Sequence, residues 1–143
     1  MDYTWLIFAV LSAVFASLVA IFGKIGLAEI DANTATMIRA GIMFAFLVLV
    51  IMFTGKINEI SKIISNQNAV FYIFLSGVAG ALSWLFYFLA LKFGKISQVV
   101  PIDRLSIIFA IILAFLIIGE KISLKIAIGT AFMAVGAILI ALG

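Results

Sequence analysis

Residues 69–91 read AVFYIFLSGVAGALSWLFYFLAL and contain no charged side chain. As an α-helix this run would extend ~35 Å, enough to cross the ~30 Å hydrocarbon core of a bilayer. It is far too long for a strand of a membrane barrel, and in lipid only a helix satisfies such a backbone internally. The stretch therefore predicts a transmembrane helix.

The rest of the chain has the same character. Of its 143 residues 67% are hydrophobic and 10% are charged, whereas soluble domains are ~45–50% apolar and ~25% charged. We therefore predict an all-α membrane protein with five transmembrane helices in a single domain, residues 1–143. Besides 69–91, the expected spans are about 5–23, 34–54, 96–118 and 123–142.

The first apolar run is expected to be a span and not a secretory signal. Its lead-in, Met1-Asp2-Tyr3-Thr4, lacks the positive charge of a signal peptide, and the run is too long for the apolar part of one. Tyr3 and Trp5 lie where an interfacial aromatic belt is expected.

Two residue types are missing, and their absence restricts the chemistry. The chain has no cysteine and no histidine, which excludes disulfides, thiol chemistry and the usual zinc sites. It also removes the commonest general base. Asp103 is the one acid inside an expected span, so a carboxylate pair within one chain is excluded. We expect no enzyme activity, metal, cofactor or nucleic-acid partner, and the net charge of +3 bears on topology.

The expected helix ends share a Gly-Lys-Ile pattern, at 23–25, 55–57 and 94–96, and the fourth span ends similarly with Gly119-Glu120-Lys121-Ile122. We interpret each glycine as a left-handed C-terminal residue and each lysine as a complement to the negative helix end. After the second of these ends, Ile57, Ile60 and Ile64 recur at helical spacing among charged residues. That segment is either a short amphipathic helix in the headgroup plane or a structured loop.

Lysine and arginine are evenly divided between the two sides of the membrane. Four fall on each side when Arg104, which we place deeper, is left out, so the positive-inside rule gives no preferred orientation. A chain with an odd number of spans and no bias can insert both ways up. Two opposed copies would form an inverted pair like those of secondary transporters, so we expect a homodimer, possibly antiparallel. The groups are Lys56, Lys62, Lys121 and Lys125 against Lys24, Arg39, Lys92 and Lys95.

Five polar or amphipathic groups from three expected helices share one depth, roughly 6–12 Å from one membrane surface. Charges at such depth usually face a partner or a wet cavity. Arg39 is a candidate ion-pair partner for Asp103, which would leave Arg104 available to a solute. Packing and interfacial anchoring are the alternative explanation for the aromatic members. The predicted solute-binding residues are Arg39, Trp84, Tyr87, Asp103 and Arg104.

Pro101 decides between two interpretations of the fourth span. If the helix begins near Ile96, Pro101 removes the hydrogen bond to the Ser97 carbonyl and kinks the helix beside Asp103, a candidate gating position. If the helix begins at Pro101, the proline is an ordinary first-turn residue and the charges are interfacial.

With these residues in view, the chain resembles the EamA-like group of the drug/metabolite transporter superfamily. The resemblance covers nearly the whole chain and is carried by short motifs. It implies a polytopic transporter of small metabolites in the cytoplasmic membrane, here as one unfused five-helix half. Unlike the small multidrug-resistance relatives, the first span has no acid, which favours a neutral, zwitterionic or anionic solute. The motifs are 83–91 (SWLFYFLAL), 100–106 (VPIDRLS), 119–123 (GEKIS), the Gly-spaced helix 128–140, Lys24 and Arg39.

The leading hypothesis is a secondary carrier that acts as an antiparallel homodimer by alternating access. Two alternatives remain open. One is a channel-like or flippase-like protein with dual orientation. The other is a non-transporting membrane subunit of a larger assembly, which the small-residue helix faces would permit.

Overall fold

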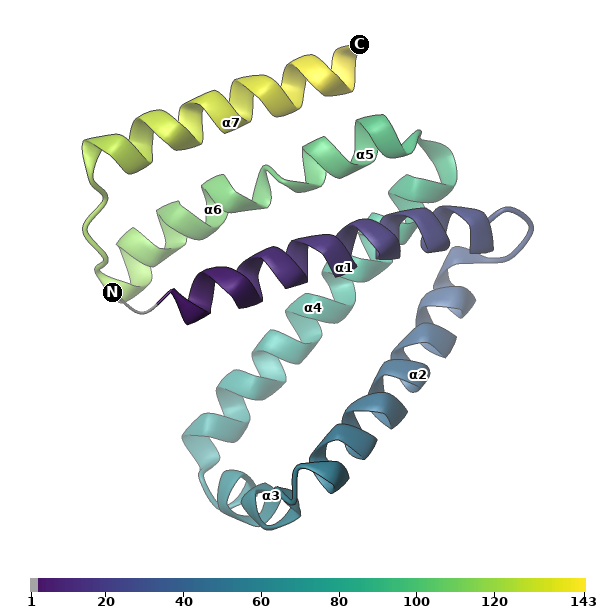
Figure 1. Ribbon diagram of the computed structural model, residues 1–143, viewed down its shortest axis with the longest axis vertical. Helices are drawn as coiled ribbons and strands as arrows, with labels where there is room; N and C mark the ends of the chain where they lie inside the picture. The colour runs from purple at the N-terminus through teal and green to yellow at the C-terminus, as the bar shows by residue number, and fades with distance from the viewer. Residues whose placement is uncertain (1–2) are drawn as a thin grey trace. The chain divides into compact units, whose positions relative to one another are not determined.

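The computed structural model describes residues 3–143, so Met1 and Asp2 of the expected lead-in lie outside the described residues. Over that range all regular structure is helical and no strand occurs. Figure 1 shows the elements. They are α1 (Thr4–Gly26), α2 (Ala32–Phe53), α3 (Ile57–Ile64), α4 (Gln67–Phe93), α5 (Ile96–Asp103), α6 (Ser106–Leu113), the π-helix η1 (Ala114–Ile118) and α7 (Leu124–Leu142).

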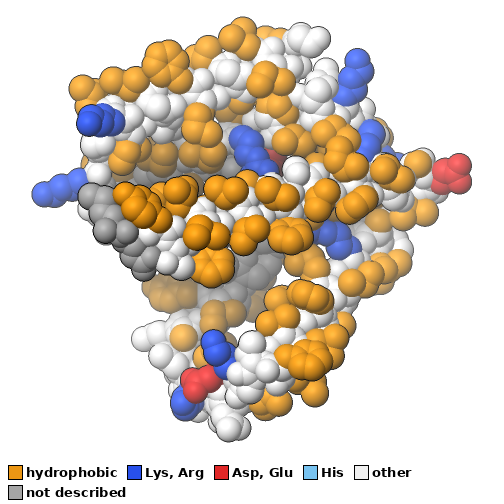
Figure 2. All heavy atoms as spheres, viewed as in Figure 1, with side chains coloured by type: hydrophobic (Ala, Val, Ile, Leu, Met, Phe, Trp, Pro, Cys, Tyr) orange, Lys and Arg blue, Asp and Glu red, His pale blue; other side chains and the backbone are white. Residues whose placement is uncertain are grey.

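Among residues 3–143, five helical segments are long and apolar enough to cross a membrane, which confirms the predicted fold class. Hydrophobic side chains, orange in Figure 2, cover most of the visible helix surface. A water-soluble protein would bury such residues, whereas here lipid is the surrounding solvent. The spans are α1, α2, α4, the segment Ile96–Ile118 that contains α5, α6 and η1, and α7.

The chain forms two units, and each is described by itself. Of the described residues, the first contains 3–24 and 93–143, and within it α7 packs along α5 and α6. The second contains residues 25–92, with α2, α3 and α4. Of the predicted site residues, Asp103 and Arg104 belong to the first unit and Arg39, Trp84 and Tyr87 to the second.

Two glycines end helices in the expected left-handed conformation, Gly55 with φ 67° and Gly119 with φ 76°. At the end of α2 the Lys56 N–H donates to the Ile51 carbonyl at 3.1 Å and the Gly55 N–H to the Met52 carbonyl at 3.1 Å. This is the Schellman arrangement, which satisfies two of the last carbonyls of the helix.

The same expectation is wrong for the other two glycines. Gly23 lies inside α1, which continues to Gly26, and Gly94 does not adopt a positive φ. A glycine inside a helix costs only ~1 kcal/mol relative to alanine, so its presence alone does not end one. Lys24 instead donates from Nζ to the Gly94 carbonyl at 2.9 Å, within the first unit.

The fourth span begins at Ile96 and is broken part-way along. Pro101 lies inside α5, and α6 begins only at Ser106 (Figure 1). Across the break the backbone bonds close three residues back, from the Leu105 N–H to the Ile102 carbonyl at 3.0 Å and from the Ile107 N–H to the Arg104 carbonyl at 3.1 Å. These tighter turns shift the register of the helix and interrupt the regular i to i−4 ladder.

The segment after α2 is a helix, α3, and not an irregular loop. Its apolar residues Ile57 and Ile60 help line a hollow of about 430 Å³ against the last turns of α2. Its polar face carries an ion pair in which Lys62 Nζ lies 2.6 Å from Glu59 Oε1. Such a division of faces is typical of a helix that lies at a membrane surface. The hollow is lined by Phe44, Leu47, Val48, Ile51, Met52, Ile57 and Ile60.

Candidate functional site

The start of α2 is fixed by hydrogen bonds in the second unit. Asp31 caps this helix: its carboxylate accepts from the Thr34 N–H at 2.8 Å and from the Thr34 hydroxyl at 3.0 Å. The backbone bond first, and the hydroxyl next, lower the pKa of the Asp31 carboxyl. Beside it, Lys92 of α4 donates from Nζ to the Ile30 carbonyl at 3.1 Å. The last turn of α4 is thereby tied to the entry of α2.

Two turns into α2, Arg39 crosses to α4 and stacks on aromatic rings. Its guanidinium carbon lies 3.8 Å from the centroid of the Trp84 ring and 4.7 Å from that of Phe88. Trp84 and Phe88 are one helical turn apart, so their rings face the same neighbour. A cation over an aromatic ring is stabilised by ~0.5–2 kcal/mol, with tryptophan the best partner. The contact joins two spans through a charge.

One nitrogen of this guanidinium lacks an acceptor. Nη1 of Arg39 is buried and has no hydrogen-bond partner among the described residues. A buried donor left in this state costs ~1–3 kcal/mol, and native structures contain few of them. The aromatic rings stabilise the guanidinium through its flat face. Its N–H groups point outward in the guanidinium plane, so the rings do not accept hydrogen bonds from them. The arrangement therefore leaves a directed donor at membrane depth.

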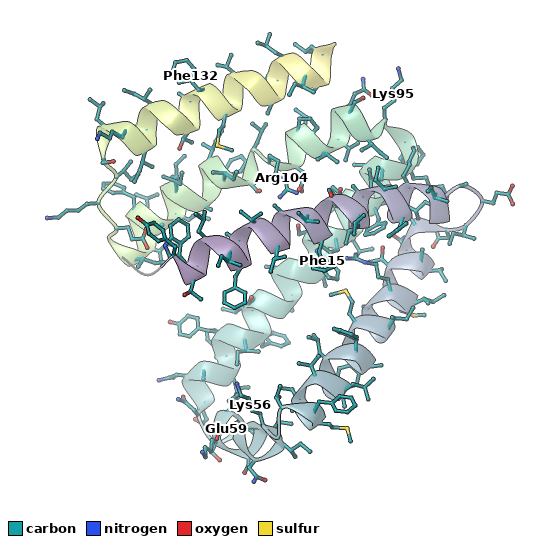
Figure 3. All side chains as sticks on the ribbon, in the orientation of Figure 1. Phe15, Lys56, Glu59, Lys95, Arg104 and Phe132 are labelled. Atoms are coloured by element: carbon teal, nitrogen blue, oxygen red, sulfur yellow. The ribbon has the colours of Figure 1, made fainter. Side chains whose placement is uncertain are left out.

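The first unit contributes a charged pair at the break in the fourth span. Asp103 is the last residue of α5 and is half-buried, while Arg104 is the first residue of the break and is exposed. Figure 3 labels Arg104 at the thin turn between α5 and α6. Among residues 3–143 the ion pair joins Lys62 and Glu59, so neither Asp103 nor Arg104 has an ion-pair partner within its own unit.

The structure brings together part of the predicted set. Arg39 and Trp84 are in contact, and Tyr87 lies beside them with its ring edge-on to that of Phe88, 5.8 Å between centroids. Phe88 was not predicted as a site residue. The periodicity of α4 places it one turn from Trp84, which is the pattern that could have found it. The ion pair of Arg39 with Asp103 stays a prediction.

The donor set does not fit a metal. No group of three or more acidic side chains that could hold an ion occurs among residues 3–143. What the two units offer is arginine guanidinium groups, aromatic faces and one carboxylate. In each unit, groups of these kinds are chemically suited to an organic solute, through charge and stacking, and not to a metal ion.

Comparison with known proteins decides the family. Residues 3–142 match the EamA-like transporter family. The chain belongs to this family. It is also 40% identical over 141 residues to a protein of Sinorhizobium sp. named "Uncharacterized transporter in cobO 3'region", and the match covers 99% of each chain. No solved structure matches it.

Membership of the EamA-like family agrees with the resemblance noted from the motifs and with the five apolar helices. The chain is thus a multi-pass membrane protein of a transporter family. The relative from Sinorhizobium has nearly the same length as this chain, since the match covers almost all of both.

Proposed function

We propose that this protein is a secondary carrier of small solutes in the cytoplasmic membrane, and that it works by alternating access as an antiparallel homodimer. The observation that carries the proposal is the interrupted fourth span, in which Asp103 ends the first half-helix and Arg104 begins the break before the second. Discontinuous helices with exposed backbone and charge near mid-membrane are characteristic of secondary transporters, where they form solute and ion sites.

The roles of the site residues follow from their chemistry. Arg39, Trp84 and Tyr87 contact the solute, and Arg104 provides a second cationic contact. Asp103 is the one acid within a span and is the proton- or ion-linked group. Pro101 keeps the fourth span interrupted, because it lacks the N–H that would bond the Ser97 carbonyl, and so permits the two half-helices to move separately.

The class of solute is neutral, zwitterionic or anionic. The first span, α1, contains no Asp or Glu, so it has no carboxylate with which to hold a cation in the membrane. The guanidinium groups of the candidate residues repel cations as well. A cationic-drug antiporter is therefore disfavoured.

The dimer is proposed from the charge balance. Four cationic residues on each side give the chain no preferred orientation, and two opposed copies supply the inverted symmetry that alternating access uses. A reporter fused after Gly143 tests this directly. Activity on both sides of the membrane supports dual orientation, whereas activity on one side alone contradicts it. Lysines added to one loop should then force a single orientation and abolish transport by the protein in isolation.

Flux measurements test the carrier function. The purified protein is reconstituted in liposomes, and saturable uptake of a panel of labelled solutes is compared for wild type, Asp103→Asn and Arg104→Gln. Matched controls are Glu29→Gln and Lys121→Gln, which remove a negative and a positive charge outside the spans. Saturable flux lost in the first pair and kept in the second supports the proposal. Unchanged flux in Asp103→Asn and Arg104→Gln contradicts the site, and flux that never saturates supports a channel instead.

A further inference from the structure

The guanidinium of Arg39 lies against two aromatic rings within the second unit. It lies 3.8 Å from the centroid of the Trp84 ring and 4.7 Å from that of the Phe88 ring, so both contacts come from one face of α4. Its Nη1 is buried and has no hydrogen-bond partner among the described residues. The rings hold the cation by its face, while the Nη1 amino group is left without an acceptor.

Stacking cannot complete the environment of this group. An aromatic ring attracts the cation through its face, whereas guanidinium N–H groups point outward in the guanidinium plane. The hydrocarbon core contains no water to accept from them. The chemistry that this position requires is therefore an oxygen acceptor lying in the plane of the guanidinium.

The charge of that acceptor follows from the two helices. Neither α2 nor α4 contains an aspartate or a glutamate, so both helices together supply no counterion to Arg39. A monoanion would neutralise the guanidinium, whereas a neutral amide would leave the charge buried. A phosphate with a charge near −2 would leave an excess negative charge in a medium of low dielectric.

We propose that Nη1 of Arg39 donates to a carboxylate of the transported solute, with the guanidinium held in place by Trp84 and Phe88. This inference rests on the proposed carrier function and narrows its solute class from neutral, zwitterionic or anionic to carboxylate-bearing. Trp84 and Phe88 are positioning residues, since they hold the cation and do not themselves take the carboxylate. Charge-assisted N–H···O contacts of this kind are ~2.7–2.9 Å long.

Trp84 provides a direct readout of binding. The chain has two tryptophans, so Trp5→Phe leaves Trp84, in contact with Arg39, as the sole indole. Emission of this variant is titrated in maltoside micelles free of phospholipid with acetate, glycine and leucine, and with their amides acetamide, glycinamide and leucinamide. We expect a saturable change with the carboxylates at concentrations at least about tenfold lower than with the amides.

Variants separate the role of the charge from that of the fold. Arg39→Gln should abolish the carboxylate response, and Arg39→Lys should weaken it about tenfold or more, because lysine keeps the charge but loses the planar fork and the stacking. The matched control is Lys92→Gln, because Lys92 is a cation of the same unit that bonds a backbone carbonyl. The carboxylate response of this control should stay within about twofold of that of the Trp5→Phe parent. Helical circular dichroism confirms that each variant is folded.

Further titrations distinguish a solute carboxylate from inorganic phosphate and from a lipid headgroup as the ligand of Arg39. Inorganic phosphate binding as tightly as the carboxylates, or competition by added phosphatidylglycerol, would show that Arg39 takes a phosphate or a lipid headgroup and would overturn the proposal. A response that appears only in Asp103→Asn would show that Asp103 occupies Arg39 and would also overturn it. Equal responses to acids and amides, a response retained in Arg39→Gln, or no saturable response to any carboxylate would do the same.

Measuring solute flux alongside binding distinguishes a failure of this inference from a failure of the carrier proposal. Carboxylate binding at Arg39 without any saturable flux would support the site and contradict the carrier. Saturable flux of amides and acids alike, unaffected by Arg39→Gln, would support the carrier and overturn the inference.

Discussion

The guanidinium carbon of Arg39 lies 3.8 Å from the centroid of the Trp84 ring, and this contact joins α2 to α4. An arginine that stabilised the fold in the ordinary way would also have its N–H groups paired. Here one of them, Nη1, is buried without a partner among the described residues. Stabilisation by the ring and destabilisation by the unpaired donor thus oppose each other at a single side chain.

The balance predicts that Arg39→Met raises thermal stability in the absence of solute. Removing the guanidinium forfeits a cation–π contact of ~0.5–2 kcal/mol, but relieves an unsatisfied donor of ~1–3 kcal/mol and the cost of a charge in a span, ~2.5–3.5 kcal/mol on insertion scales. Methionine keeps contact with the rings through its sulfur. Thermal unfolding in detergent, followed by circular dichroism, measures the change.

Arg39→Lys is the control for this prediction. It keeps a positive charge at this position, now as an ammonium, but loses the planar stack on the rings, so its melting temperature should fall below that of wild type. If Arg39→Met instead unfolds several degrees lower, Arg39 holds the two helices together and its unpaired nitrogen has no bearing on stability.

A second prediction concerns the turn after η1. Gly119 has φ 76°, a conformation that costs an L-residue roughly 1–2 kcal/mol, so Gly119→Ala should lower the free energy of unfolding by about 1 kcal/mol. Gly26→Ala is the matched control, because Gly26 ends α1 without a positive φ and an added Cβ would meet nothing within 4 Å. Equal stability of the two variants in the same unfolding assay would contradict the assignment of strain to Gly119.

The acidic limb of the stability profile gives a third prediction. The pKa of Asp31 lies below its ordinary value of 3.8 because the Thr34 N–H and hydroxyl donate to its carboxylate. The folded form thus binds this proton less readily than the unfolded form, so the capping contribution is complete above the unfolded pKa and is lost as pH falls through the folded one. Melting temperature should decline below about pH 4 for this reason.

Asp31→Asn isolates that contribution. Asparagine also caps helices, but it does not titrate, so the variant should melt near the wild-type temperature at pH 3 and differ from it mainly above pH 4. Asp31 is exposed and the effect is correspondingly small. An acid-dependent loss of the same size in wild type and variant would assign the limb to other carboxylates.

The sequence allows the spans to be predicted because lipid leaves the backbone no alternative to the helix. It is less informative about where helices end, since several glycines fit a C-terminal pattern and local bonds decide among them. Gly55 ends α2 because Lys56 and Gly55 bond back to Ile51 and Met52. Gly23 lacks that arrangement and stays within α1.

The site is harder to predict than the spans because it depends on helix rotation. Counting residues from the helix ends places Arg39 and Trp84 at one depth in the membrane. Which ring contacts the guanidinium depends on how α2 and α4 are rotated toward each other, and Phe88 is in contact for that reason. The break at Arg104 and Leu105 lies three residues beyond Pro101, where the tighter bonds accumulate. The π-helix η1 has no counterpart in the hydrophobic pattern, which is uniform there.

The fourth prediction tests the broken span as a moving part. Pro101→Ala restores an N–H that can bond the Ser97 carbonyl, and the proline it removes costs ~3 kcal/mol in a helix interior. We expect amide hydrogen exchange over residues 104–108 to slow as the half-helices join, and solute flux in liposomes to fall several-fold while solute binding changes less. Ile102→Ala, at an exposed position of α5, is the control and should leave both quantities near wild type. Slower exchange with undiminished flux would show that the break is present but takes no part in transport, and the role proposed for Pro101 would have to be abandoned.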